Sequence, residues 1–189
     1  MSLFSLHVQN PSTAAVLYGV LALGLGPAAI AATQCVNPAG SNGCASTISA
    51  AVAAAAPGDT INVGLGQYAE SVVINKSISL VGAGSAATVI NAKGLPTGIY
   101  INGLDNPGLS NVLVTGFTIV NANYEGILVT NASYSFITQN HIASNDQALD
   151  FAAGTCAGLP AFETSEGEDC GEGIHLAGVH HTTVANNVV

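Results

Sequence analysis

Three carboxylates in the second half of the chain are candidates for acid–base chemistry. Asp146 and Asp150 lie close together at the end of one apolar segment, and Glu172 begins a later one. Hydrolysis of a glycosidic bond requires two carboxyl groups placed across that bond. We therefore predict Asp146, Asp150 and Glu172 as catalytic candidates, against the alternative that they are solvated surface acids.

The stretch between Cys156 and Cys170 is acidic and is soon followed by a histidine. Carboxylate oxygens at this density could hold calcium, although no EF-hand or nonapeptide calcium spacing is present. A soluble acidic loop is the alternative. We expect no required cofactor, and calcium is the candidate ion. The predicted metal ligands are Glu163, Glu166, Glu168, Asp169 and His175.

Histidines form a third group in the same half of the chain. On a strand, His175 would alternate with Ile174 and Leu176, and it would point outward if they point inward. Imidazole nitrogens bind copper or zinc, so a metal-handling role is one hypothesis. Corner histidines that only form hydrogen bonds are the alternative. The group comprises His141, His175, His180 and His181.

An internal repeat must position these side chains. Segment 125–129 (EGILV) returns as 172–176 (EGIHL), and 137–142 aligns with 184–189 at the same offset of 47. Segments 114–119 and 137–142 align at an offset of 23, which suits one turn of a solenoid. The offset of 47 then corresponds to about two turns, with a few extra residues within 152–169. Glu172 would therefore begin the next-but-one turn.

Short apolar segments punctuated by glycines predict many strands and one helix. The connections are too short for crossover helices, so a parallel sheet would have to form by coiling. Ser46 or Thr47 can cap a helix over 46–56, which 57–59 (PGD) ends. Stacked asparagine amides are expected at the corners, from Asn91, Asn121, Asn140 and Asn187. The predicted strands are 60–63, 71–74, 77–81, 88–90, 98–101, 111–114, 117–120, 126–129, 136–137 and 141–142.

The composition argues against two classes of partner. The chain has 189 residues, of which 49% are hydrophobic and 7% charged, and its formal net charge is −9. Its only basic side chains, apart from the histidines, are Lys76 and Lys93. Affinity for nucleic acid comes largely from basic side chains on phosphates, so nucleic acid and anionic lipid are not expected as partners. Divalent cations and neutral sugars are both compatible with this charge.

The N-terminal region predicts export. An apolar run over 14–32 ends in the small-residue segment 29–31 (AIA), which is typical of a signal-peptide cleavage site. We therefore predict a signal peptide over 1–31 and one domain over 32–189, although 1–13 lacks the usual basic residues. A membrane anchor is the alternative, and Pro27 makes a stable spanning helix less favourable. After cleavage no stable membrane span is expected.

The four cysteines favour the same compartment. Three pairings are possible for Cys35, Cys44, Cys156 and Cys170. Pairing each cysteine with its near neighbour in sequence is the most economical, because each bond would then close a short loop. Zinc binding is the rival, although neither pair has a CxxC spacing. We expect a secreted, periplasmic or cell-surface protein.

The run 44–91 resembles the N-terminal entry of right-handed parallel β-helix proteins of the pectate-lyase-like superfamily. The matching order is a capping helix, 57–61 (PGDTI), 66–70 (GQYAE), 74–78 (INKSI) and 80–84 (LVGAG). Segment 172–187 is similar to the β-helix repeats of carbohydrate-binding and sugar-hydrolase proteins, and equally to those of periplasmic copper-protein maturation. The resemblance covers roughly 44–189. It implies an all-β fold: a right-handed parallel β-helix, or solenoid, with a short N-terminal capping helix.

The resemblance implies less about activity. Lyases of the superfamily employ Arg or Lys, whereas this chain has no Arg and Lys76 reads as an exposed surface lysine. The signatures of the polygalacturonase branch are absent. We therefore expect carbohydrate (polysaccharide) recognition or a surface-structural role without a complete catalytic centre. A polysaccharide hydrolase or lyase and a periplasmic metal-handling protein are the alternatives.

Two further expectations concern the surface and the end of the domain. For the enzyme hypothesis, Tyr124 is the predicted aromatic platform for a sugar ring. The ligand would be a polysaccharide or a cell-surface glycan. Because the chain stops at Val189 within a predicted turn of the solenoid, we expect the domain to be truncated at its C-terminus.

Overall fold

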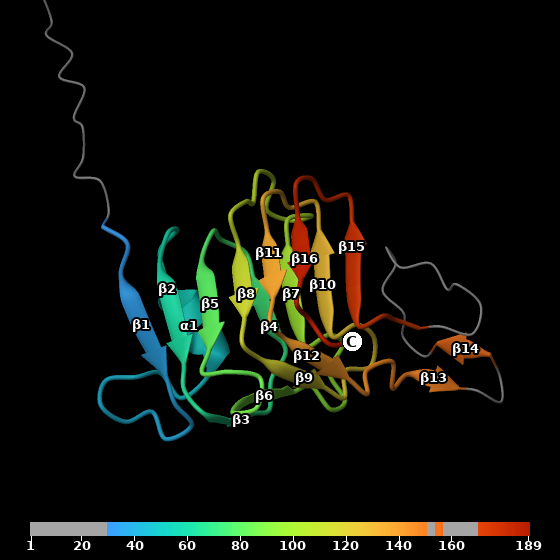
Figure 1. The fold of residues 1–189 in the computed structure, drawn as a ribbon, viewed down its shortest axis with the longest axis horizontal. Helices are drawn as coiled ribbons and strands as arrows, with labels where there is room; N and C mark the ends of the chain where they lie inside the picture. The colour runs from blue at the N-terminus through green and yellow to red at the C-terminus, as the bar shows by residue number, and fades with distance from the viewer. Residues whose placement is uncertain (1–29, 151–153, 157–169) are drawn as a thin grey trace, which may run out of the picture.

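Three parallel sheets wind around one core in the computed structural model, which describes residues 30–150, 154–156 and 170–189 (Figure 1). Successive coils contribute one strand to each sheet. Sheet 1 has the order β1 (Thr33–Val36), β2 (Thr60–Val63), β5 (Ser79–Gly82), β8 (Leu113–Thr115), β11 (Phe136–Thr138) and β16 (Thr183–Ala185).

The other two sheets complete each coil. Sheet 2 comprises β4 (Val72–Ile74), β7 (Ile99–Asn102), β10 (Ile127–Thr130) and β15 (Ile174–Ala177). Sheet 3 comprises β3 (Gly66–Tyr68), β6 (Thr88–Asn91), β9 (Thr118–Val120) and β12 (His141–Ala143). A separate antiparallel pair is formed by β13 (Leu149–Asp150) and β14 (Thr155–Cys156). The all-β parallel β-helix expected from the sequence is therefore confirmed.

Aliphatic columns fill the interior. Residues that alternate along a strand point to opposite faces, so in-register parallel pairing places like side chains above one another. On sheet 1, Ile61, Leu80, Val114 and Ile137 occupy equivalent positions, and all four are 0% exposed. The same alternation packs Ile99 and Ile127 on sheet 2. This stacking fixes which residues of each coil face outward.

The only helix of the described residues, α1 (Ile48–Ala54), covers the first coil beside β4. Thr47 caps it by accepting the Ala50 N–H at 3.2 Å, as one of the two predicted caps. From the next coil, the Glu70 carboxylate accepts the Ile48 N–H at 2.8 Å. Negative charge at a helix N-terminus is favourable. Segment 66–70, one of the motifs of the resemblance described above, therefore has a structural role, because its Glu70 stabilises the N-terminus of the capping helix.

Lys76 serves the opposite end of α1. Its Nζ donates to the carbonyl oxygens of Ala53 at 3.2 Å and Ala55 at 3.0 Å. These carbonyls lack partners within the helix, and a positive charge there is favourable. Lys76 is therefore a helix cap, a more specific role than the surface lysine expected from the sequence.

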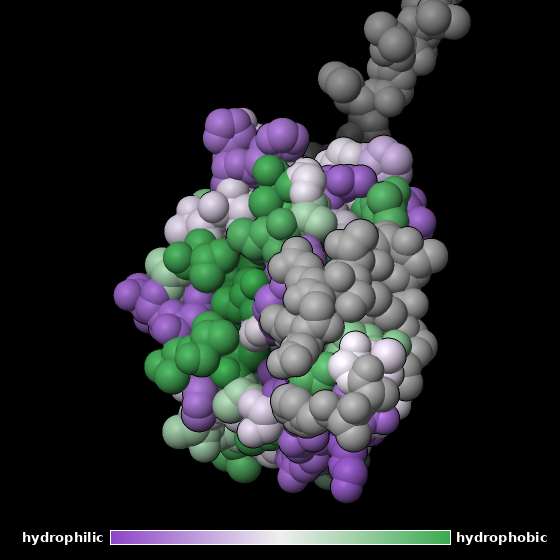
Figure 2. Space-filling view, turned by 90° about the vertical axis from the view of Figure 1, so that its right-hand side faces the viewer, coloured by the Kyte–Doolittle hydropathy of each residue, from purple (hydrophilic) through white to green (hydrophobic). Residues whose placement is uncertain are grey.

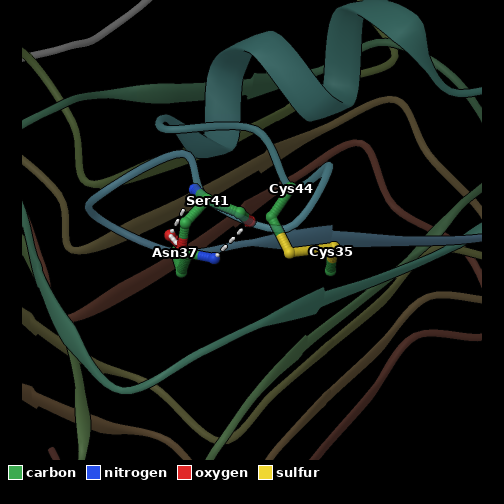
Figure 3. Close-up of a disulfide and its surroundings, with 4 residues drawn as sticks. All are labelled: Cys35, Asn37, Ser41 and Cys44. Carbon is green, nitrogen blue, oxygen red and sulfur yellow. Dashed lines mark hydrogen bonds between the residues drawn. A yellow bond between two sulfur atoms is a disulfide. The ribbon is translucent and has the colours of Figure 1, made fainter.

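The predicted strands are confirmed with small shifts at their ends, but β1, β3, β13 and β14 were not predicted. Strand β1 pairs with β2 at the edge of sheet 1, so it forms the cap together with α1. A disulfide between Cys35 in β1 and Cys44 closes the following loop, where Asn37 and Ser41 hydrogen-bond to each other (Figure 3). Cys156 and Cys170 form the second bond. The local pairing is thus confirmed, and zinc binding by these cysteines is excluded.

The prediction that an offset of 47 spans two turns is wrong. Ile127 pairs directly with Ile174, and Ile137 pairs directly with Val184, so the offset covers one coil. The preceding coil has an offset of 23, as between Phe117 and Asn140. The surplus lies in an excursion between β12 and β15, which includes β13 and β14. Glu172 therefore begins the next coil, and the excursion is about as long as an entire turn.

The asparagine corners form two separate ladders. Asn140 donates to the Asn187 side chain at 3.1 Å, and Asn121 donates to the Asn91 side chain at 3.0 Å. Between these ladders, Asn145 uses its side-chain oxygen to accept the Ala122 N–H at 3.0 Å. Buried amides in such corners satisfy backbone groups that no strand pairs. The structural role predicted for these residues is confirmed.

Among the described residues, no helix is long and apolar enough to cross a membrane.

Candidate functional site

The repeated Glu-Gly-Ile segment places two carboxylates on neighbouring coils. Glu125 and Glu172 precede the paired strands β10 and β15, and the Gly126 N–H donates to the Glu172 carbonyl at 3.1 Å. Neighbouring strands lie about 4.8 Å apart, so the two side chains leave the backbone one above the other. Glu125 is 0% exposed, while the Glu172 side chain is 39% exposed. One carboxylate is therefore buried beneath another that reaches solvent.

His175 joins this pair. Its Nδ1 lies 2.8 Å from Glu172 Oε2, and its side chain is 25% exposed. Ile174 packs against the core, so alternation along β15 turns His175 to the outer face of sheet 2. One ligand atom each of Glu125, Glu172 and His175 lies within 4.8 Å of the others. We call these three residues the Glu–Glu–His cluster.

Glycine makes this close stacking possible. A Cβ atom on Gly126 would meet Ile142 Cγ2 and would lie 2.8 Å from the Gly173 carbonyl oxygen. Gly98, in the preceding coil, is crowded in the same way by Ile119 and by the carbonyl of Gly126. The corner before sheet 2 therefore requires glycine in two successive coils, at Gly98 and Gly126. At Gly173 the nearest atoms belong to the side chains of Val189 and Ile142.

Of the predicted catalytic residues, Asp146 and Glu172 line one hollow of about 430 Å³. His141, Ile142 and Val189 also line it, and it lies at the C-terminal end of the stack. The Asp146 Oδ1 accepts the Cys170 N–H at 3.1 Å, which ties the start of the excursion to its end. Hydrophobic residues gather on this end (green in Figure 2), where Leu176, Val184, Val188 and Val189 are exposed.

The remaining predicted site residues lie elsewhere. Asp150 is exposed on β13 and does not line the hollow. Glu163, Glu166, Glu168 and Asp169 lie outside the described residues. Of the predicted metal ligands, His175 alone lies within the described ranges, and its carboxylate neighbours there are Glu125 and Glu172. Sequence reasoning missed Glu125, although its equivalence to Glu172 in the repeat was the available signal.

Tyr124 is not an exposed platform. It is 4% exposed, and burial raises the pKa of its hydroxyl above the usual range, with the nearby Glu125 adding to the rise. The prediction for this residue is therefore wrong. Its backbone binds the excursion instead, since the Asp146 N–H donates to the Tyr124 carbonyl at 2.9 Å.

An exposed aromatic corner occurs between sheets 2 and 1. The rings of Tyr134 and His181 stack with centroids 4.8 Å apart and planes inclined by 11°. Both residues have positive φ, 52° and 54°, at equivalent corners of adjacent coils. Tyr134 is 50% exposed, and Phe136, two residues later on β11, is 45% exposed. We call Tyr134, Phe136 and His181 the aromatic corner.

No described protein family and no curated protein matches the sequence. Solved structures do match the fold. One is a pectin methylesterase in complex with a hexasaccharide, at 17% identity and a TM-score of 0.50, covering 62% of this chain and 46% of that chain. Another is a variant pectin methylesterase in complex with a different hexasaccharide, at 17% identity and a TM-score of 0.51, with the same coverage.

A third match is the pectin methylesterase PemA from Erwinia chrysanthemi, at 18% identity and a TM-score of 0.50. The alignment covers 60% of this chain and 44% of that one, so the chain spans less than half the length of the structures it matches. Sequence identity at this level supports similarity of the backbone fold alone. Together with the three stacked parallel sheets, the matches show that the chain has a parallel β-helix fold like that of these pectin methylesterases.

Proposed function

We propose that this protein is an exported β-helix that binds a polysaccharide at the aromatic corner. The observation that carries the proposal is the stacked pair of Tyr134 and His181, with Phe136 exposed on the adjoining strand. Aromatic rings offer a large apolar face with a polar edge, which suits a sugar ring that has both kinds of surface. Three neighbouring exposed rings on a chain with only 5% aromatic residues support a binding role for this surface.

The charge of the chain narrows the ligand class. A formal charge of −9 with only two lysines repels an anionic polymer such as a polyuronate. A neutral polysaccharide, or a uronate polymer whose carboxylates are esterified, avoids this repulsion. The pectin methylesterases of similar fold are seen in complex with hexasaccharides, which supports an oligosaccharide as the kind of ligand. We therefore infer a neutral or esterified glycan.

Export is supported by two features. The disulfides Cys35–Cys44 and Cys156–Cys170 belong to oxidising compartments. The apolar segment over 14–32 has the composition of a leader. The proposed mature protein starts near Ala32, and N-terminal sequencing of secreted protein tests this.

Binding is tested with methyl-esterified and de-esterified homogalacturonan oligosaccharides of equal length. Calorimetric titration is expected to detect the esterified ligand and a much weaker interaction with the anionic one. Tyr134→Ala and Phe136→Ala should each weaken binding about tenfold, since a ring contact contributes about 1 kcal/mol or slightly more. Leu65→Ala is the matched control, because Leu65 is 73% exposed on the first coil. Equal binding by all variants would refute the aromatic corner.

A polysaccharide hydrolase is the second candidate, and it rests on one observation. Asp146 and Glu172 line the same hollow, so two carboxylates face one space large enough for part of a sugar. Asp146 already accepts a backbone hydrogen bond, which favours a structural role. Release of reducing ends from the same oligosaccharides, abolished in Glu172→Gln, would establish hydrolysis. Unchanged ligand after prolonged incubation would leave binding as the function.

A further inference from the structure

We propose that the Glu–Glu–His cluster is a binding site for one divalent transition-metal ion, with Zn²⁺ as the best-suited ion. The site goes beyond the proposed polysaccharide binding and does not depend on it. It consists of Glu125, Glu172 and His175, and one ligand atom of each already lies within 4.8 Å of the others.

The backbone fixes the relative positions of the three proposed ligands. Glu125 and Glu172 occupy the same position of adjacent coils, held by the bond from the Gly126 N–H to the Glu172 carbonyl. His175 follows on β15 and reaches back to Glu172 Oε2 at 2.8 Å. Zn²⁺ binds oxygen and nitrogen at about 2.0–2.2 Å, which places ligand atoms about 3–3.6 Å apart. A side-chain adjustment on the order of 1 Å therefore brings the three donors onto one ion.

The electrostatics favour a cation at this position. Glu125 is 0% exposed and lies against a second carboxylate, so two negative charges would approach in a region of low dielectric. The chain has no Arg, and its two lysines are engaged or located elsewhere. Lys76 donates to carbonyls of α1, and Lys93 is exposed in the turn after β6. A bound divalent ion would offset this repulsion.

The donor set selects the class of metal. An imidazole nitrogen with two carboxylates suits zinc and its first-row neighbours, whereas Ca²⁺ requires six to eight oxygen ligands. Three protein ligands leave one position of a tetrahedron for water. Glu172 lines the hollow at the end of the stack, which gives an ion and a water access from solvent. The buried Glu125 forms the floor of the site.

The test uses the full chain after treatment with a chelator and its removal. Calorimetric titration with Zn²⁺ is expected to give one ion per chain, and Co²⁺ should develop the visible absorption of a low-symmetry site. Glu125→Gln and His175→Ala should each weaken Zn²⁺ binding about 100-fold, because loss of a ligand costs at least as much as loss of a supporting residue. Ca²⁺ should not compete with Zn²⁺.

His180→Ala is the matched control, since His180 is an exposed corner histidine outside the cluster. It should bind Zn²⁺ like the wild type. Thermal melting without metal shows whether each variant folds, and Zn²⁺ should raise the midpoint of the wild type and of His180→Ala only. Absence of Zn²⁺ binding, preference for Ca²⁺, or Zn²⁺ affinity that survives both Glu125→Gln and His175→Ala would each overturn the site.

Discussion

Asn140 and Asn187 form the rung that joins the last two coils of the stack. Asn140 Nδ2 donates to Asn187 Oδ1 at 3.1 Å, and the Asn140 backbone N–H donates to the same oxygen at 3.0 Å. Asn187 in turn donates to the carbonyl of Ile137 at 2.8 Å. One amide thus satisfies three groups at a corner where the strands are interrupted. The ladder fixes the vertical alignment of the coils that carry the Glu–Glu–His cluster.

Asn140→Ala should destabilise the protein by about 1–3 kcal/mol. Asn140 is 2% exposed, and its Oδ1 accepts the buried Phe117 N–H at 3.1 Å, so alanine leaves that donor without its partner. Urea denaturation followed by circular dichroism measures the loss. Asn187→Ala is the control, because Asn187 is only half-buried and its loss should cost less. A larger effect for Asn187 than for Asn140 would contradict this account.

Gly126→Ala should also destabilise the fold, by about 1–3 kcal/mol, through overpacking. The new Cβ would meet Ile142 and would lie 2.7 Å from Asn145 Nδ2, so the corner would have to open. Gly94→Ala is the comparison: Gly94 has a φ of 76° but has open space around its Cβ position. Denaturation midpoints should fall further for Gly126→Ala. Equal shifts would mean that backbone conformation, and not crowding, selects glycine.

Asp59 should make the N-terminal cap sensitive to acid. Its carboxylate accepts the N–H groups of Ala32 at 2.7 Å and Ala56 at 2.9 Å, and these bonds lower its pKa below 3.8. A carboxyl with a lowered folded-state pKa stabilises above its unfolded pKa, and this stability is lost as the pH falls through the folded pKa. Asp59→Asn should therefore be less stable than the wild type at pH 7.

The difference between wild type and Asp59→Asn should narrow as the pH falls below about 4, because the wild-type carboxyl is then protonated as well. Thermal midpoints from pH 7 to about 2.5 measure this difference, and subtraction removes the contribution of the other acids. A gap that stays constant over this range would show that the charge of Asp59 does not stabilise the cap.

The repeat predicted the fold, because in-register stacking requires equivalent residues at equivalent positions. Alignment of Ile137 with Val184 identified them as equivalent positions, but the predicted spacing of two turns did not anticipate that their strands pair directly. The turn count failed because an offset cannot distinguish two coils from one coil with a coil-sized excursion. Strand β1 was missed because its polar residues precede any repeat partner. Regular positions are thus predictable from periodicity, whereas insertions and edges are not.

The candidate sites were only partly predictable for a related reason. Glu172 and His175 were identified by residue type, but their partner Glu125 lies one coil below and looks like part of the scaffold. Tyr134 belongs to a corner with positive φ, which is uncommon for a tyrosine and is not indicated by apolar patterning. Tyr124 was misassigned because its residue type does not reveal that the ring is buried. A site formed by residues of two coils can be recognised only when the pairing register of their strands is known.

Loss of the Cys35–Cys44 disulfide should loosen the N-terminal end of the stack without unfolding the rest. The bond closes a loop with a sequence separation of 9, and cross-links of this size stabilise by about 2–3 kcal/mol. Asn37 and Ser41 retain hydrogen bonds within the loop, so it is not without other support (Figure 3). Because each coil contacts only its neighbours, the effect should decay along the solenoid.

Hydrogen exchange in Cys35→Ser/Cys44→Ser should therefore accelerate in β1 and α1, and amides of β10 and β11 should exchange at wild-type rates. The control is Cys156→Ser/Cys170→Ser, whose cross-link lies at the other end of the molecule and should leave β1 protected. Uniform loss of protection along the chain in the first variant would show that the coils unfold as one unit, which would contradict nearest-neighbour stacking.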